Sequence, residues 1–221
     1  THAAPIRTIG FVLYPGVNGL DVVGPHEVLA RLRGVEVRMI ATRKGPVSTD
    51  TGGLTLHATH DWSDSAVDVL VIPGGRGVDA IAEDSGFMEH LTQAQTQAGE
   101  VLTVCTGAVL LARTGCVAGR RATTHWAHRV QLAGLGVEVS EERTCRDGAW
   151  WSGAGVSAGI DLALRFVGER VSTRLARQLT VAMEYDPQPP CGRGTLDALE
   201  PEAQQALIAA LTPSVRSRSS T

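Results

Sequence analysis

Apolar residues gather in short runs along this chain, and stretches with helical spacing separate them. Near-continuous apolar runs lie at residues 6–14, 35–42, 67–75 and 101–104, and the third, VDVLVIPGG, is the strongest. Runs without polar alternation are typical of strands that are covered on both faces. Stretches such as HEVLARL and VSAGIDLALRFVGERV instead have the spacing of helices. The alternation of strand with helix predicts an α/β fold with a doubly wound, mostly parallel sheet.

Turn-forming residues divide the rest of the sequence into smaller elements. The segment GPVSTDTGGLTLHATHDW predicts a β-ribbon that turns at Gly52-Gly53. We further expect short helices up to residue 98, a return to the sheet edge at Thr123–Trp126, a strand and hairpin at 137–148, a short strand at Trp150–Ser152, a helix at 201–211 and a frayed tail at 213–221. The prolines of 185–190 cannot continue a helix or join a central strand, so the compact core is predicted to extend from about residue 6 to about residue 187.

The sharpest predicted turn lies within VLTVCTGAVLLARTG, residues 101–115. A buried strand ends there and a buried helix starts, which places Cys105 at a strand-to-helix elbow. Unpaired N–H groups and the helix dipole favour an anion at such a position, so we expect an exposed thiol with a lowered pKa. The alternative is that Cys105 is a small buried apolar residue.

Three other features are predicted to reach the same edge of the sheet. Asp21 lies near the start of a helix that Leu20 opens, with Pro25 in its first turn, and it is either a helix cap or a carboxylate at the mouth of the sheet. Gly74-Gly75 ends the strongest strand, and 153–155 forms a turn into a helix. Ligands of such sheets bind outside the carboxyl ends of the strands, where we expect these residues to meet Cys105.

Composition narrows the classes of function. The 221 residues fit one α/β domain, with 43% apolar and 19% charged residues, and the net charge of -3 gives no basic footprint for nucleic acid. The four cysteines show no metal-type spacing, which favours a reducing, cytoplasmic setting. His57 and His60 are too irregularly placed to predict a metal site. No apolar run approaches the roughly 20 residues of a membrane span, and the first residues lack a signal-peptide core.

Five ordered motifs resemble a known family. LDVVGPHEVL, VIPGG, VCTGAVLLARTG, RRATTHWA and AGVSAGIDLAL resemble the ThiJ/PfpI superfamily of glutamine-amidotransferase-like proteins, and within it most closely the isocyanide hydratases. The likeness extends from residue 6 to about residue 187. It implies a flavodoxin-like sandwich, a homodimer and a cysteine nucleophile at Cys105. It also implies that Asp21 is the acidic residue facing that nucleophile and that Thr106 is the residue after the elbow.

The resemblance predicts an enzyme that hydrates an organic isocyanide without a cofactor. Cys105 would attack the terminal carbon while Asp21 donates a proton and then activates water. Gly74, Gly75 and Gly155 are expected to line the substrate site together with Thr106. Protease-like relatives have a histidine directly after the cysteine, so Thr106 argues against Cys-His hydrolysis. Ala154 stands where the hydratases tend to have a glycine, which predicts a change in pocket shape.

Two alternatives remain open at this point. Sensor domains of AraC-type regulators carry similar motifs, but they append paired helix-turn-helix units, and after Pro190 only a single helix is predicted here. Redox sensing through oxidation of Cys105 is the second alternative. The sequence therefore predicts a small-molecule substrate and no nucleic-acid or membrane partner.

Overall fold

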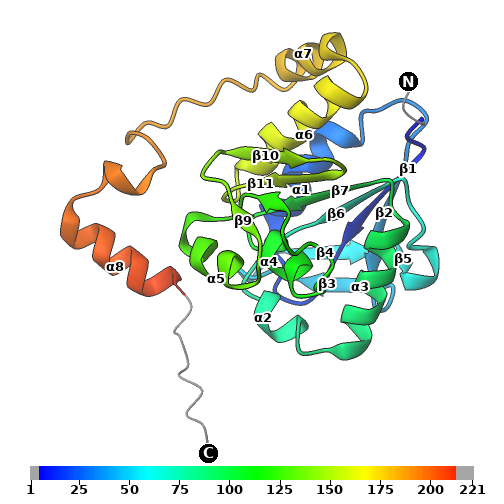
Figure 1. Cartoon of the computed structure of the whole chain (residues 1–221). Coiled ribbons are helices and arrows are strands. Elements are labelled where there is room, and N and C mark those ends of the chain that lie inside the picture. Colours follow the sequence, from blue (N-terminus) through cyan, green and yellow to red (C-terminus); the bar gives the residue numbers. More distant parts are fainter. Residues whose placement is uncertain (1–4, 213–221) are drawn as a thin grey trace, which may run out of the picture.

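A seven-stranded sheet forms the centre of the molecule (Figure 1). The computed structural model describes residues 5–212, so the predicted frayed tail lies outside the described residues. The strand order is β10-β11-β7-β6-β1-β2-β5, and every neighbouring pair is parallel except β10 with β11. The strands are β1 (Thr8–Val12), β2 (Glu36–Ala41), β5 (His60–Asp61), β6 (Val69–Ile72), β7 (Glu100–Val104), β10 (Thr144–Asp147) and β11 (Trp150–Gly153). The predicted α/β fold with a mostly parallel sheet is confirmed.

Helices cover both faces of this sheet. Figure 1 shows α1 and α6 on one face, and α3 and α4 on the other. The helices are α1 (Gly19–Leu29), α2 (Val78–Ile81), α3 (Ser85–Gln97), α4 (Gly107–Ala112), α5 (Arg129–Gly134), α6 (Ala158–Arg170), α7 (Thr173–Ala182) and α8 (Pro201–Leu211), with short 3-10 turns at η1 (Trp62–Asp64), η2 (Trp126–His128) and η3 (Leu196–Ala198). Helix α7 was not predicted from the sequence. Within residues 5–212, no helix is both long and apolar enough to cross a membrane.

Two small sheets flank the main one. Strands β3 (Gly45–Ser48) and β4 (Thr55–Ala58) form the predicted ribbon, and Gly52 and Gly53 at its turn have φ values of +70° and +69°. Strands β8 (Arg121–Ala122) and β9 (Glu138–Val139) pair with each other in parallel. The expected return of Thr123–Trp126 to the edge of the main sheet is confirmed, because the Thr123 N–H donates to Ser152 Oγ on β11 and the Thr124 hydroxyl donates to the Cys105 carbonyl.

Helix α1 begins earlier than the sequence suggested. Its N-cap is Asn18, whose side chain accepts hydrogen bonds from the N–H groups of Leu20 and Asp21. Pro25 consequently lies in the second turn, not in the first as predicted. A proline there lacks the N–H that would bond to the carbonyl of Asp21. Its ring packs against α6 at Gly159, where an added Cβ would lie 3.0 Å from Pro25 Cγ, so the glycine permits the close approach of the two helices.

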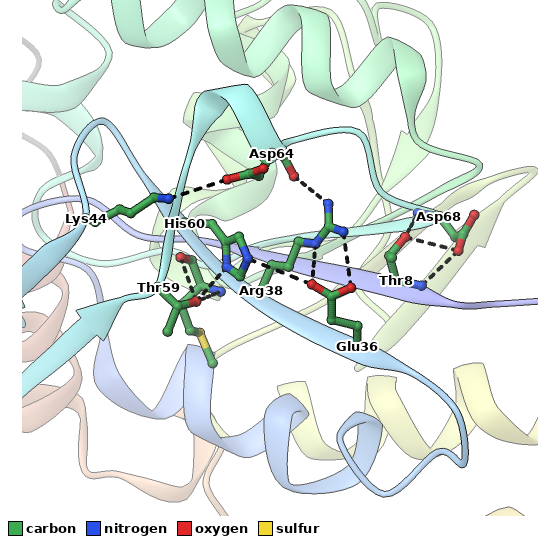
Figure 2. A network of polar contacts seen from close by, with 9 residues as sticks. Thr8, Glu36, Arg38, Lys44, Thr59, His60, Asp64 and Asp68 are labelled. Atoms are coloured by element: carbon green, nitrogen blue, oxygen red, sulfur yellow. Dashed lines mark hydrogen bonds and ion pairs between the residues drawn. The ribbon is translucent and has the colours of Figure 1, made fainter.

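A polar network secures the ends of the strands that face away from Cys105 (Figure 2). Asp68, just before β6, accepts hydrogen bonds from the N–H and the hydroxyl of Thr8 at the start of β1. Arg38 on β2 pairs with Glu36 and donates to the carbonyl of Asp64 in η1. These contacts fix the register of the first strands and leave the opposite edge free for chemistry.

Candidate active site

Cys105 lies in a tight turn between β7 and α4. Its φ is +56°, a left-handed conformation that is uncommon for a side-chain-bearing residue. The Cys105 N–H donates to the carbonyls of Gly153 and Ala154, at 3.0 and 2.9 Å, and the hydroxyl of Thr124 donates to the Cys105 carbonyl at 2.8 Å. The predicted strand-to-helix elbow is confirmed. Its strained backbone is held by the 153–155 turn and by the TTHW motif.

The Asp21 side chain is completely buried beneath the elbow. Its Oδ2 accepts a hydrogen bond from the Gly74 N–H at 2.9 Å, and its buried Oδ1 has no hydrogen-bond partner among residues 5–212. The sequence left open whether Asp21 is the N-cap of the helix. Asn18 is the N-cap, so Asp21 does not have that role. A buried carboxyl with one unpaired oxygen is costly to fold. Such a group is typical of a functional site.

Burial has the largest effect on the pKa values of Asp21 and Cys105. Loss of solvent raises the pKa of Asp21 to about 7, the nearby charge of Asp50 adds to the rise, and the Gly74 N–H and Cys105 oppose it. The pKa of Cys105 is raised well above its usual value, first by burial and then by the charge of Asp21. The two groups therefore titrate as a coupled pair that retains its protons to higher pH than isolated side chains would.

The expected exposed thiol with a lowered pKa is therefore wrong. Only 7% of Cys105 is accessible, and α4, whose N-terminus was expected to stabilise the thiolate, has six residues. The N–H and hydroxyl of Thr106 and the N–H of Val156 do favour the thiolate, but desolvation and Asp21 outweigh them.

The two glycines after β6 hold the polar side chains of the site. Gly74 donates to Asp21, and the Gly75 N–H donates to Thr106 Oγ1 at 3.0 Å. A Cβ on Gly74 would lie 2.4 Å from that hydroxyl, so only a glycine allows the contact. In the sequence analysis these glycines were expected to line the substrate site. In the structure their N–H groups are engaged by Asp21 and Thr106 and position them.

A cavity of about 580 Å³ opens above Cys105. It has the size of small-molecule sites in general. Its lining comes from seven parts of the chain: Asn18, Asp50, Thr51, Gly75, Arg76, Val78, Asp79, Cys105, Thr106, His125, His128, Gln131, Val156, Ala210, Leu211 and Thr212. Of the residues expected to line the substrate site, Gly75 and Thr106 are part of this lining, whereas Gly74 and Gly155 are not. Asp21 and Ala154 are not part of it either, so the added methyl of Ala154 does not enter the cavity.

His125 is a cavity residue to which the sequence analysis gave no function. Burial, with smaller contributions from His128 and Arg129, lowers its pKa to about 4, so the ring is neutral at pH 7. Its Nδ1 accepts a hydrogen bond from the Ala127 N–H, which leaves the ring proton on Nε2 as a donor. A Cβ on Gly155 would lie 3.0 Å from His125 Cδ2, so this glycine makes room for the imidazole. The TTHW motif was the only sequence feature that pointed to this residue.

Asp50 was also missed, because it lies in the turn of the β3–β4 ribbon, for which the sequence predicted a structure but no function. It accepts hydrogen bonds from the side chain of Asn18 and from the Arg76 N–H, all long at 3.4–3.5 Å. Across residues 5–212, no group of three histidine, cysteine, aspartate or glutamate side chains is arranged to hold a metal ion. The cavity thus contains the Cys105 thiol, the Asp50 side chain and a neutral imidazole, and the buried Asp21 carboxyl lies outside its lining.

Comparisons with known proteins agree on the family. The profile of the DJ-1/PfpI family matches residues 7–169. An isonitrile hydratase from Pseudomonas putida is 40% identical over 190 residues, which cover 86% of this chain and 83% of that protein. The deglycase PfpI of Pyrococcus furiosus is 27% identical over 135 residues, which cover 60% of this chain and 81% of that protein.

A solved structure extends the likeness to the whole described fold. The crystal structure of a ThiJ/PfpI family protein from Pseudomonas syringae superposes with a TM-score of 0.89 at 32% identity, covering 93% of this chain and 86% of that one. The coverage reaches beyond the residues that the family profile matches.

Proposed function

The chain belongs to the DJ-1/PfpI family, and from that premise we propose that it is a cysteine-dependent enzyme that adds water to an organic isocyanide to give the N-substituted formamide. The observation that carries this proposal is the buried pair of Cys105 and Asp21 beneath a cavity of about 580 Å³. One oxygen of Asp21 has no hydrogen-bond partner among the described residues, and its pKa of about 7 lets it both give and take a proton near neutrality.

In the first half of the reaction, sulfur and hydrogen add to one carbon. The reactive form of the pair carries a single proton, which rests on the Cys105 thiol because the pKa of the thiol lies above that of Asp21. Asp21 takes this proton as the sulfur attacks and becomes the neutral acid. The sulfur forms a bond to the terminal carbon of the isocyanide, and that carbon takes the proton from Asp21. The product is a thioimidate, R–N=CH–S–Cys105, and Asp21 is left as a carboxylate.

In the second half, water replaces the sulfur. Asp21 takes a proton from water as hydroxide adds to the thioimidate carbon, and it returns that proton to the nitrogen. The C–S bond then breaks as the hydroxyl loses its proton to the Cys105–Asp21 pair, which restores the starting state. The Thr106 N–H and hydroxyl and the Val156 N–H favour the departing thiolate. The sum is one isocyanide and one water to one formamide.

The buried thiol bears on the redox alternative. Oxidation by peroxide requires an accessible thiolate, and Cys105 is 7% accessible with a raised pKa. Catalysis by Cys105 together with Asp21 is therefore better supported than redox sensing.

The proposal is tested by incubating the purified protein with an alkyl and an aryl isocyanide in H2¹⁸O and measuring labelled formamide. Cys105→Ser should remove turnover, while Cys145→Ser, at a buried cysteine on β10, should retain it. Absence of formamide from the wild-type protein, or full activity of Cys105→Ser, would refute the proposal.

We also propose a homodimer that acts on small molecules without a nucleic-acid partner, as the family resemblance implies. Sedimentation velocity should give the mass of two chains, unchanged by isocyanide, and a gel-shift assay should show no complex with duplex DNA. A ligand-dependent DNA complex would instead favour the sensor alternative.

A further inference from the structure

Residues 184–212, here called the C-terminal arm, carry α8 away from the end of α7 (Figure 1). Between α7 and α8 the arm contains only the 3-10 turn η3. None of the residues of α8 is buried, and Leu207 and Ile208 are 36% and 39% exposed. Packing into the core therefore does not explain where α8 lies.

The C-terminal end of α8 has a specific neighbour. Ala210 and Leu211, together with Thr212, line the same cavity as Cys105. These residues come from the far end of the sequence, more than a hundred positions after the elbow. The cavity is thus bordered on one side by an element that is separate from the sheet.

The lining of this cavity has two chemical parts. Charged and amide side chains, among them Asp50, Arg76 and Gln131, occupy part of it, whereas Val78, Val156 and Leu211 supply its larger apolar side chains. An isocyanide group is only two atoms long, so most of the volume of about 580 Å³ is left for the organic group attached to its nitrogen. That group is apolar in simple isocyanides, and its burial is favourable only against apolar side chains.

We propose that Leu211 is a specificity-determining residue, whose side chain packs against the organic group of the substrate and selects bulky apolar isocyanides over small ones. The inference rests on the proposed function for the identity of the reacting group. It adds a function for α8, which the reaction at Cys105 and Asp21 does not require.

The kinetic test compares methyl isocyanide with cyclohexyl isocyanide. Leu211→Ala should lower kcat/KM for the cyclohexyl substrate by roughly tenfold and leave methyl isocyanide within about twofold, as expected for a lost apolar contact. Leu207→Ala is the matched control, because it makes the same change on the same helix at a residue outside the cavity lining. An unchanged ratio of the two substrates in Leu211→Ala, or the same change of ratio in Leu207→Ala, overturns the proposal.

A second measurement does not depend on isocyanide turnover. The rates at which N-ethylmaleimide and N-cyclohexylmaleimide modify Cys105 are followed by peptide mass spectrometry in the full chain. Leu211→Ala should slow the cyclohexyl reagent selectively, by roughly the same factor, while Leu207→Ala should not. If formamide is never formed but this selectivity is found, the proposed reaction fails and the assignment of Leu211 stands. If formamide is formed and neither ratio responds, the assignment of Leu211 fails alone.

Discussion

Replacing Asp21 by asparagine should remove most of the activity and stabilise the protein above pH 7. Asparagine keeps the shape of the side chain and an oxygen that can accept the hydrogen bond from the Gly74 N–H. It has no proton to transfer, so turnover should fall by roughly 10²- to 10⁴-fold. The stability effect has a separate origin, because the carboxylate of the wild-type protein is charged in a site that excludes water.

The magnitude follows from the raised pKa. The folded protein binds the Asp21 proton more tightly than the unfolded chain does, so the unfolded chain releases it first and stability falls as the pH rises from about 4 to about 7. The difference between a pKa of about 7 and the ordinary value of 3.8 corresponds to about 4 kcal/mol, at about 1.4 kcal/mol per pKa unit. Roughly 2–3 kcal/mol of this is lost between pH 5 and pH 8. Asparagine does not titrate and avoids the loss.

The measurement is guanidinium unfolding of wild type and Asp21→Asn at pH 5 and pH 8, followed by tryptophan fluorescence. The free energy of unfolding of the variant, relative to that of wild type, should be higher at pH 8 than at pH 5 by roughly 2–3 kcal/mol. Asp84→Asn makes the same substitution at the N-cap of α3, where the carboxylate is exposed, and controls for the chemical change. If the unfolding free energies of Asp21→Asn and wild type changed equally between the two pH values, Asp21 would not have a raised pKa. The assignment of Asp21 as the proton donor would then be wrong.

Three further predictions test neighbouring parts of the site. Asp50→Asn removes a charge that raises the pKa of Asp21, so the rise of kcat/KM through pH 7 should shift to lower pH; an unmoved profile would mean that Asp50 does not act on the pair. Iodoacetamide at pH 7.5 should modify the exposed Cys116 and Cys191 before the buried Cys105, as peptide mass spectrometry would show, and faster labelling of Cys105 would contradict the raised thiol pKa. Gly155→Ala should lower kcat/KM because its Cβ would lie 3.0 Å from His125 and would displace the imidazole in the cavity, whereas Gly134→Ala, with open space around it, should not; equal activity of the two variants would show that turnover does not depend on the position of His125.

The sequence predicted what local patterns determine. The apolar runs located β1, β2, β6 and β7, and the change from strand to helix around Cys105 located the elbow. The pKa of that thiol was predicted in the wrong direction, because its burial depends on α1 and the 153–155 turn, which are distant in sequence. Pro25 was placed in the first turn but lies in the second, since the helix begins at Gly19 after the Asn18 cap and not at Leu20.

Other cavity residues gave no local pattern to recognise. Asp50 lies in the turn of a ribbon, His125 lies between β8 and η2, and Leu211 is the last residue of a helix without buried residues. Each residue reaches the cavity only through the tertiary fold. The burial that lowers the pKa of His125 depends on the tertiary fold in the same way. Long-range placement of this kind cannot be derived from periodicity or from turn chemistry.

The two edge strands of the main sheet, β5 and β10, also limit how copies of this chain can associate. At one border β5 has only two residues, and at the other the Thr144 carbonyl of β10 accepts a hydrogen bond from Arg165 at 3.0 Å. Arg146 on the same strand pairs with Glu169. An unprotected border strand is a template for aggregation, and short length and charged side chains are the usual defences. Concentrated solutions of this protein should therefore resist fibril formation, and any second copy must dock through helices or loops instead of continuing the sheet.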